Sequence, residues 1–236
     1  MTDRAPRVDD RAPRACAALV LHLLWIAAAW RRRSYEHAGP PTGASRGPSA
    51  ARYPLGVLEE YEPRSAQEAV DLERVRALVA AGDPWNRKLP LHVTGSAIVL
   101  HPPSARVLLR WHQRQQAWLQ VGGHADPGES DPFAIALREA TEETGLQDLE
   151  PWPQAAQPKP IHVAVVPVPA GRGEPAHEHA DVRFTLATSS PDSIRPESEK
   201  AALEWLDLRT AIARTGTDNL RESLERLSAL LAAQCG

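Results

Sequence analysis

Gly122-Gly123-His124-Ala125-Asp126-Pro127-Gly128-Glu129 is a glycine-rich loop that follows a predicted strand and precedes a predicted helix. Asp131 can cap that helix with its side chain, and Pro132 suits the first helical position because its missing N–H costs nothing there. Gly145 is a typical C-terminal stop. Together these residues predict a strand, a loop and a helix over 132–144.

The predicted helix has two chemically different sides. On one side Glu139, Glu142 and Glu143 are neighbours at i, i+3 and i+4. Such carboxylates repel one another unless a cation lies among them, and oxygen ligands of this kind suit Mg²⁺ or Mn²⁺. The other interpretation is a solvated face with i to i+4 charge pairs. The apolar side, which we expect to face the core, consists of Phe133, Leu137 and Ala140.

The same residues carry a family resemblance. Gly123, Glu129 and Arg138-Glu139-Ala140-Thr141-Glu142-Glu143-Thr144-Gly145-Leu146 resemble the Nudix box, G-x5-E-x7-R-E-U-x-E-E-x-G-U, where U is apolar. All the fixed letters match, but eight residues separate Glu129 from Arg138 where the usual pattern has seven. The extra residue falls between Ser130 and Leu137, so it lengthens the loop-to-helix junction and leaves the partner of Glu129 open.

This resemblance implies both a fold and an activity. The fold is an α/β/α sandwich with a mixed β-sheet, here with a leading helix and a C-terminal helix. The activity is that of a nucleotide pyrophosphohydrolase, a hydrolase of acid anhydrides in which water cleaves a diphosphate linkage with Mg²⁺, or Mn²⁺, as cofactor. By resemblance Arg138 orients the acids, Glu142 and Glu143 bind metal, and Glu139 is a further ligand or the general base. Glu129 and Gly123 support them.

Several functional questions stay open in the sequence. The expected partner is a small nucleotide-type molecule, either a nucleoside diphosphate derivative or a nucleoside triphosphate. A homodimer is compatible with the resemblance. The alternatives to a free hydrolase are a catalytically silent Nudix-like domain that senses a nucleotide, and a membrane-tethered hydrolase. ADP-ribose, oxidised nucleoside triphosphates, dinucleoside polyphosphates and sugar nucleotides all fit as substrates.

Histidines suggest a secondary site. In an extended strand His177, His179 and Asp181 alternate onto one face, where they could bind a transition metal or contact phosphate. The alternative is ordinary exposed loop histidines. His124, inside the glycine-rich loop, could reach a phosphate oxygen or be a plain surface residue.

Other side chains could also contribute to the site. Three downstream acids, any of which could supply a further metal ligand or base, are Glu197, Glu199 and Glu204. Trp111 and Trp118 could stack on a base, although aromatic residues on strands are more often core.

The chain of 236 residues divides into three parts. We expect residues 1–52 to be a disordered extension with a short apolar segment, 15–30, which is shorter than the roughly 20 residues that span a bilayer. Residues 53–90 hold a leading helix, whose Ser65 and Glu68 have capping-box spacing, and a linker. Residues 91–236 form the Nudix domain with its C-terminal helix, expected over 218–233.

Charge and cysteine content narrow the class of protein. A net charge of -3 argues against binding a nucleic acid polymer through a broad basic face. The two cysteines do not suggest a disulfide framework, so we expect a reduced, cytoplasmic compartment. The strands that the pattern predicts cover 93–100, 106–111, 117–121, 161–168 and 181–188.

Overall fold

The computed structural model describes residues 55–171 and 173–234. The extension 1–52 and its apolar segment, 15–30, lie outside these residues. Within the described ranges, every helix is too short or too polar to cross a lipid bilayer.

The described strands form one mixed, eight-stranded sheet centred on β1 (Leu91–His101). β1 pairs in parallel with β7 (His177–Ala187) along one edge. Along its other edge it pairs antiparallel, with β4 (Val121–His124) near its start and with β2 (Arg106–His112) near its end. The remaining strands, all antiparallel to their neighbours, are β3 (Ala117–Leu119), β5 (Glu150–Pro151), β6 (His162–Val168) and β8 (Leu203–Asp207).

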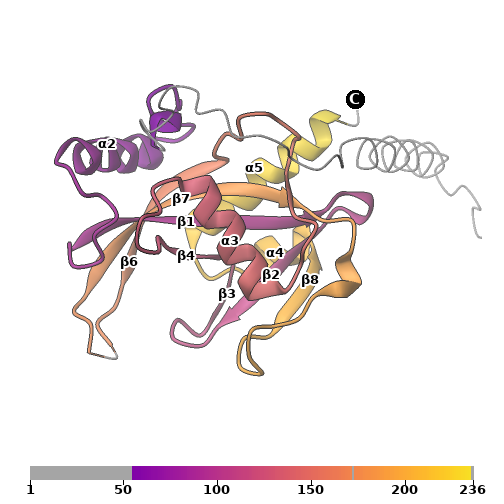
Figure 1. Ribbon diagram of the computed structural model, residues 1–236. Coiled ribbons are helices and arrows are strands. Elements are labelled where there is room, and N and C mark those ends of the chain that lie inside the picture. The colour runs from indigo at the N-terminus through magenta and orange to yellow at the C-terminus, as the bar shows by residue number, and fades with distance from the viewer. Residues whose placement is uncertain (1–54, 172, 235–236) are drawn as a thin grey trace, which may run out of the picture. The chain divides into compact units, whose positions relative to one another are not determined.

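Alternation along β1 creates a core on each face of the sheet. Val93, Ala97 and Val99 enter the core beneath α3 (Pro132–Thr144). Ile98 and Leu100 point the other way, into the core under α4 (Leu208–Arg214) and α5 (Asp218–Gln234). Figure 1 shows α3 in front of the sheet with α4 and α5 behind it. The described part is therefore the expected α/β/α sandwich.

Helix α3 begins and ends where the sequence predicts. The Asp131 carboxylate accepts the backbone N–H of Phe133 at 2.9 Å, and Gly145 closes the helix with a φ of 73°. The helix lies directly on β1 at Gly95, where an added Cβ would stand 2.4 Å from the backbone oxygen of Pro132. A glycine in β1 thus sets how closely the helix carrying the acids approaches the sheet.

Helix α2 (Ala66–Ala80) covers the edge strand β6. Ser65 caps it as predicted, accepting the N–H of Glu68 at 3.2 Å. Glu68 returns a bond to the helix start, but to the Arg64 N–H at 2.6 Å and not to that of Ser65, while its other oxygen accepts the Val163 N–H of the sheet edge at 3.0 Å. Asp71 binds the Val165 N–H in the same way, also at 3.0 Å. These carboxylates occupy backbone donors that an edge strand otherwise leaves open.

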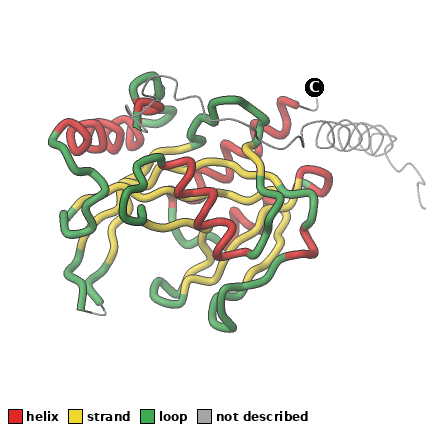
Figure 2. The backbone as a smooth tube through the Cα atoms, in the orientation of Figure 1, coloured by secondary structure: helices red, strands yellow, loops and turns green. Residues whose placement is uncertain are grey.

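Several predicted boundaries shift in the structure. The strand predicted over 117–121 is two strands, β3 and β4, and β4 runs on to His124, so the glycine pair lies in a strand and not in a loop (Figure 2). The strand predicted over 181–188 begins earlier, at His177, and includes both histidines. Helix α4 and strands β5 and β8 lacked a sequence prediction because all three are short. The C-terminal helix predicted over 218–233 is confirmed as α5.

Candidate active site

Arg138 lies at the centre of the acidic cluster on α3 and contacts three of its carboxylates. Its guanidinium binds both carboxylate oxygens of Glu129, with Nε 3.0 Å from Oε1 and Nη2 2.9 Å from Oε2. Nη1 lies 3.1 Å from an oxygen of Glu139 and 3.0 Å from one of Glu142. Nη2 also donates to the backbone carbonyl of His124 at 2.8 Å. One planar cation therefore fixes three carboxylates and the end of β4.

The extra residue between Glu129 and Arg138 does not separate their side chains. Glu129 accepts the backbone N–H of Asp126 at 2.8 Å, which ties it to its own loop, while its carboxylate meets Arg138. The additional length is taken up before Pro132, where α3 begins. Glu129 thus keeps the arginine as its partner.

The glycine pair lets two acids lie against β4. Glu143 accepts the N–H of Gly122 at 3.0 Å. At Gly123 a Cβ would stand 2.5 Å from the carboxylate carbon of Glu139, so only glycine leaves that carboxylate its place. Gly122 is confined as well, since a Cβ there would meet Ser96 of β1 at 2.4 Å. Close packing of strand and helix therefore sets the positions of Glu139 and Glu143.

Arg110 of β2 is a site residue that sequence reasoning missed. Its guanidinium lies 3.2 Å from Glu143 and 3.1 Å from Glu197. The only trace in the sequence is a basic residue directly after the apolar run Val107-Leu108-Leu109. Of the downstream acids, Glu197 is thus connected to the α3 cluster, whereas Glu204 pairs with Arg214 at 2.6 Å.

Burial changes the acidity of the cluster. It raises the pKa of Glu143 to about 7, against the opposing effects of Arg110 and the Gly122 N–H. Burial also raises the pKa of Glu139. Glu129 behaves oppositely, because its hydrogen bonds from Arg138 hold its pKa below the usual range. Glu139 and Glu143, which lie against β4, are therefore the two acids whose charged forms are disfavoured by burial.

These acids fit a hard divalent cation. The side chains of Glu139 and Glu143 are only 17% and 12% exposed, yet Glu142 beside them is 56% exposed, so the cluster opens to solvent on one side. Carboxylate oxygens with room for water and phosphate are the ligand set Mg²⁺ prefers. Burial raises the pKa of Glu139 and Glu143 although Arg138 and Arg110 lie beside them, so a cation bound among these acids would favour their charged forms.

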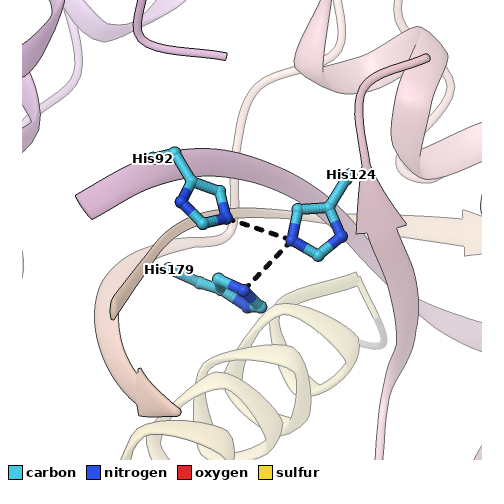
Figure 3. Close-up of side chains that lie close together, drawn as sticks. All are labelled: His92, His124 and His179. Atoms are coloured by element: carbon cyan, nitrogen blue, oxygen red, sulfur yellow. Dashed lines mark hydrogen bonds between the residues drawn. The ribbon is translucent and has the colours of Figure 1, made fainter. Parts of the chain in front are cut away.

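The structure also brings the predicted histidines together. His124 and His179 lie on the sheet face opposite α3, together with His92 of β1, which the sequence did not single out (Figure 3). His177 of β7 adjoins them through its contact with His179. The exposed-loop interpretation is wrong for His177 and His179, because both lie in β7.

The two tryptophans pack against each other and against neighbouring side chains. Trp111 and Trp118 pair across β2 and β3 as an edge-to-face contact, with ring centroids 5.6 Å apart. Trp118 also packs against the core beneath α5 and lies under the guanidinium of Arg214, 5.1 Å from its ring centroid. This is a packing role.

A comparison with known proteins identifies the family of the domain. A family profile described as "NUDIX domain" matches residues 91–227. A curated octanoyltransferase of Myxococcus xanthus is 30% identical over 183 residues, which is 75% of this chain and 44% of that protein. The chain thus spans less than half the length of this relative.

Solved structures show a more distant likeness. An Ap4A hydrolase of C. elegans, in a binary complex, is 20% identical with a TM-score of 0.48, over 60% of this chain and 98% of that one. The dihydroneopterin triphosphate pyrophosphohydrolase of E. coli is 21% identical with a TM-score of 0.46, over 61% of this chain and 97% of that one. Neither likeness is close enough to indicate a substrate.

Proposed function

The chain belongs to the NUDIX domain family, and on that premise we propose that it is a Mg²⁺-dependent hydrolase of a diphosphate linkage. Its substrate is a nucleoside diphosphate derivative or a nucleoside triphosphate, and Mn²⁺ can replace Mg²⁺. The catalytic residues are Arg138, Glu139, Glu142 and Glu143.

One observation carries this proposal. Arg138 holds Glu129, Glu139 and Glu142 within hydrogen-bond distance of a single guanidinium, while Glu143 is fixed from the other side by the Gly122 N–H and by Arg110. A merely solvated acidic helix face would not need buried carboxylates, a glycine to admit one of them, and two arginines.

The chain's own side chains can orient one another and can take a proton from water. Arg138 orients Glu139 and Glu142, and Glu129 in turn anchors Arg138. Glu143, whose pKa burial raises to about 7, or Glu139, whose pKa burial also raises, is suited to take a proton from water. A bound divalent cation would neutralise charge on the phosphoryl oxygens and make water more acidic.

The proposed activity is tested on the full chain with Mg²⁺. ADP-ribose, a nucleoside triphosphate, a dinucleoside polyphosphate and a sugar nucleotide are each assayed for released phosphate and mononucleotide. We expect turnover of at least one, lost with EDTA and restored by Mg²⁺. If none of these compounds were hydrolysed, the proposal would be contradicted. If one of them still bound without being cleaved, the nucleotide-sensing alternative would be favoured.

A matched pair of variants tests the acids. Glu143→Gln keeps the side-chain shape but removes the charge, and we expect turnover to fall by about 10² to 10⁴-fold. Glu73→Gln, an exposed glutamate on α2, should leave turnover unchanged. If Glu143→Gln hydrolysed the substrate at the parental rate, the assignment of the acids would be wrong.

A further inference from the structure

Three imidazole nitrogens converge on the sheet face opposite α3. His124 Nε2 lies 3.1 Å from Nε2 of His92 and 3.2 Å from Nε2 of His179 (Figure 3). In a tetrahedral zinc site with the usual Zn–N bond length, neighbouring ligand nitrogens are about 3.3 Å apart. Two of the spacings thus match those of ligands around one ion, and the ligand atoms of all three rings lie within 4.8 Å of one another.

The outer nitrogens of two rings are held as metal-binding histidines require. His92 Nδ1 lies 3.1 Å from the Leu89 carbonyl oxygen, and His177 Nδ1 lies 2.9 Å from that of Pro175. Because a carbonyl only accepts, each Nδ1 carries the hydrogen in the neutral ring, and each Nε2 presents a lone pair to the cluster. A backbone carbonyl that fixes the tautomer in this way is the usual support of a metal ligand.

Hydrogen bonds alone do not satisfy these nitrogens. Nε2 contacts run from His92 to His124, to His179 and, at 3.2 Å, on to His177. The two end nitrogens have no hydrogen, and each of the two middle rings can offer at most one. The three contacts therefore have at most two N–H donors between them. In at least one contact the two nitrogens face each other without a hydrogen bond. A cation among the lone pairs removes that conflict.

The backbone prearranges the cluster. His92, His124 and His179 come from β1, β4 and β7, which are hydrogen-bonded neighbours, and His92 stands directly opposite His179 in the register. Sites carried by strands keep their geometry better than sites on loops. His92 is 1% exposed, while His124 and His179 are half-buried, so one side stays open for a fourth ligand.

Protonation state agrees with the geometry. Burial, together with the neighbouring histidines and Arg87, lowers the pKa of His124 to about 3 and that of His179 to about 4. Burial also lowers the pKa of His92. All three rings are therefore neutral at pH 7, the form that binds metal.

We propose that His92, His124 and His179 form a transition-metal site, with Zn²⁺ as its preferred ion and an open fourth position for water or an anion. Imidazole nitrogens select Zn²⁺ over Mg²⁺, which prefers oxygen ligands. The site is separate from the α3 carboxylates, which lie across the sheet. It does not rest on the proposed hydrolase activity.

A second cluster with similar residue types holds an arginine instead. Glu68, His162 and Glu222 also bring potential ligand atoms together. There, however, Arg226 binds Glu68 at 2.6 Å and also binds Glu222. A cation from the chain already occupies that cluster, whereas the described residues place none among the nitrogens of His92, His124 and His179.

The site is tested by direct metal binding to the full chain. Protein freed of metal by chelator dialysis is titrated with Co²⁺, followed by visible absorption, and then with Zn²⁺ in competition. We expect one Co²⁺ per chain with the intense bands of a tetrahedral, nitrogen-ligated ion, and displacement by Zn²⁺. His179→Ala and His124→Ala should each weaken binding by more than about 100-fold.

Two controls separate this site from other causes of metal binding. His101→Gln, which changes a histidine bound to Ser104, and Glu143→Gln, which changes the α3 cluster, should both keep the tetrahedral spectrum. Circular dichroism and thermal unfolding without metal confirm that each variant folds. The proposal is overturned if the parent protein shows no tetrahedral Co²⁺ spectrum, or if the folded His179→Ala variant binds Co²⁺ as the parent does.

Discussion

The guanidinium of Arg226 on α5 lies 2.6 Å from the carboxylate of Glu68 on α2, although 158 positions separate the two residues in the chain. Both side chains are nearly inaccessible to solvent. Glu68 also accepts the Val163 N–H of edge strand β6 at 3.0 Å, and Arg226 donates to the Ile161 carbonyl at 3.0 Å. This pair therefore fastens the leading helix, the edge of the sheet and the last helix to one another.

Removing one partner of this buried pair should strongly destabilise the fold. Glu68→Ala leaves Arg226 with an uncompensated buried charge and frees the Val163 N–H, so we expect the free energy of unfolding to fall by about 3 to 5 kcal/mol. Urea denaturation measures this free energy of unfolding. The exposed neighbour variant Glu73→Ala should change it by less than about 0.5 kcal/mol. Equal effects of the two substitutions would contradict a structural role for the pair.

The same carboxylate should make stability depend on acid pH. Burial raises the pKa of Glu68, but hydrogen bonds from Arg226, from the Arg64 backbone N–H and from other donors outweigh it and lower the pKa to about 2. A pKa lower in the folded state than in the unfolded chain stabilises the fold above about pH 4.5 and is lost as pH falls toward 2. The stability advantage over Glu68→Gln should therefore shrink from pH 6 to pH 3 in urea titrations. A constant difference would show that Glu68 is not ionised in the fold.

A single methyl group at Gly123 should damage activity more than stability. Its Cβ would stand 2.5 Å from the Glu139 carboxylate, which is the flexible end of a side chain and can move away. We expect Gly123→Ala to fold with a nearly parental melting temperature but to lose about 10² in kcat. The matched substitution Gly216→Ala, where nothing lies within 4 Å of the added Cβ, should preserve both. An active Gly123→Ala variant would mean that the position of Glu139 is not critical.

Replacing Arg138 by lysine should also fail, although the charge is kept. Lysine has one ammonium group in place of a planar fork, so it cannot bind both oxygens of Glu129 and still reach Glu139 and Glu142. We expect Arg138→Lys to reduce kcat by about 10² or more. Arg74→Lys changes an exposed ion pair with Glu178, and parental kinetics are expected there. If Arg138→Lys were fully active, the fork geometry would be irrelevant to the reaction.

Local sequence determined the helix that carries the acids. Asp131, Pro132 and Gly145 act through contacts within a few residues, so the bounds of α3 follow from the amino-acid sequence alone. The spacing of Glu139, Glu142 and Glu143 likewise places them on one side of any α-helix. The alternation of β1, β2 and β6 predicted strands for the same reason, whereas strand ends, the break between β3 and β4 and the short elements α4, β5 and β8 were missed.

Tertiary structure decided which distant side chains meet. Arg110 reaches Glu143, Glu68 binds Arg226 of the last helix, and His92 joins His124 and His179 only because β4 and β7 both pair with β1 in a fixed register. Periodicity tells which face of a strand a residue occupies, but strand order and register are set by the packing of the whole sheet. The sequence by itself thus determined the acidic helix and its family, while the fold decided the partners of its acids and assembled the histidine cluster.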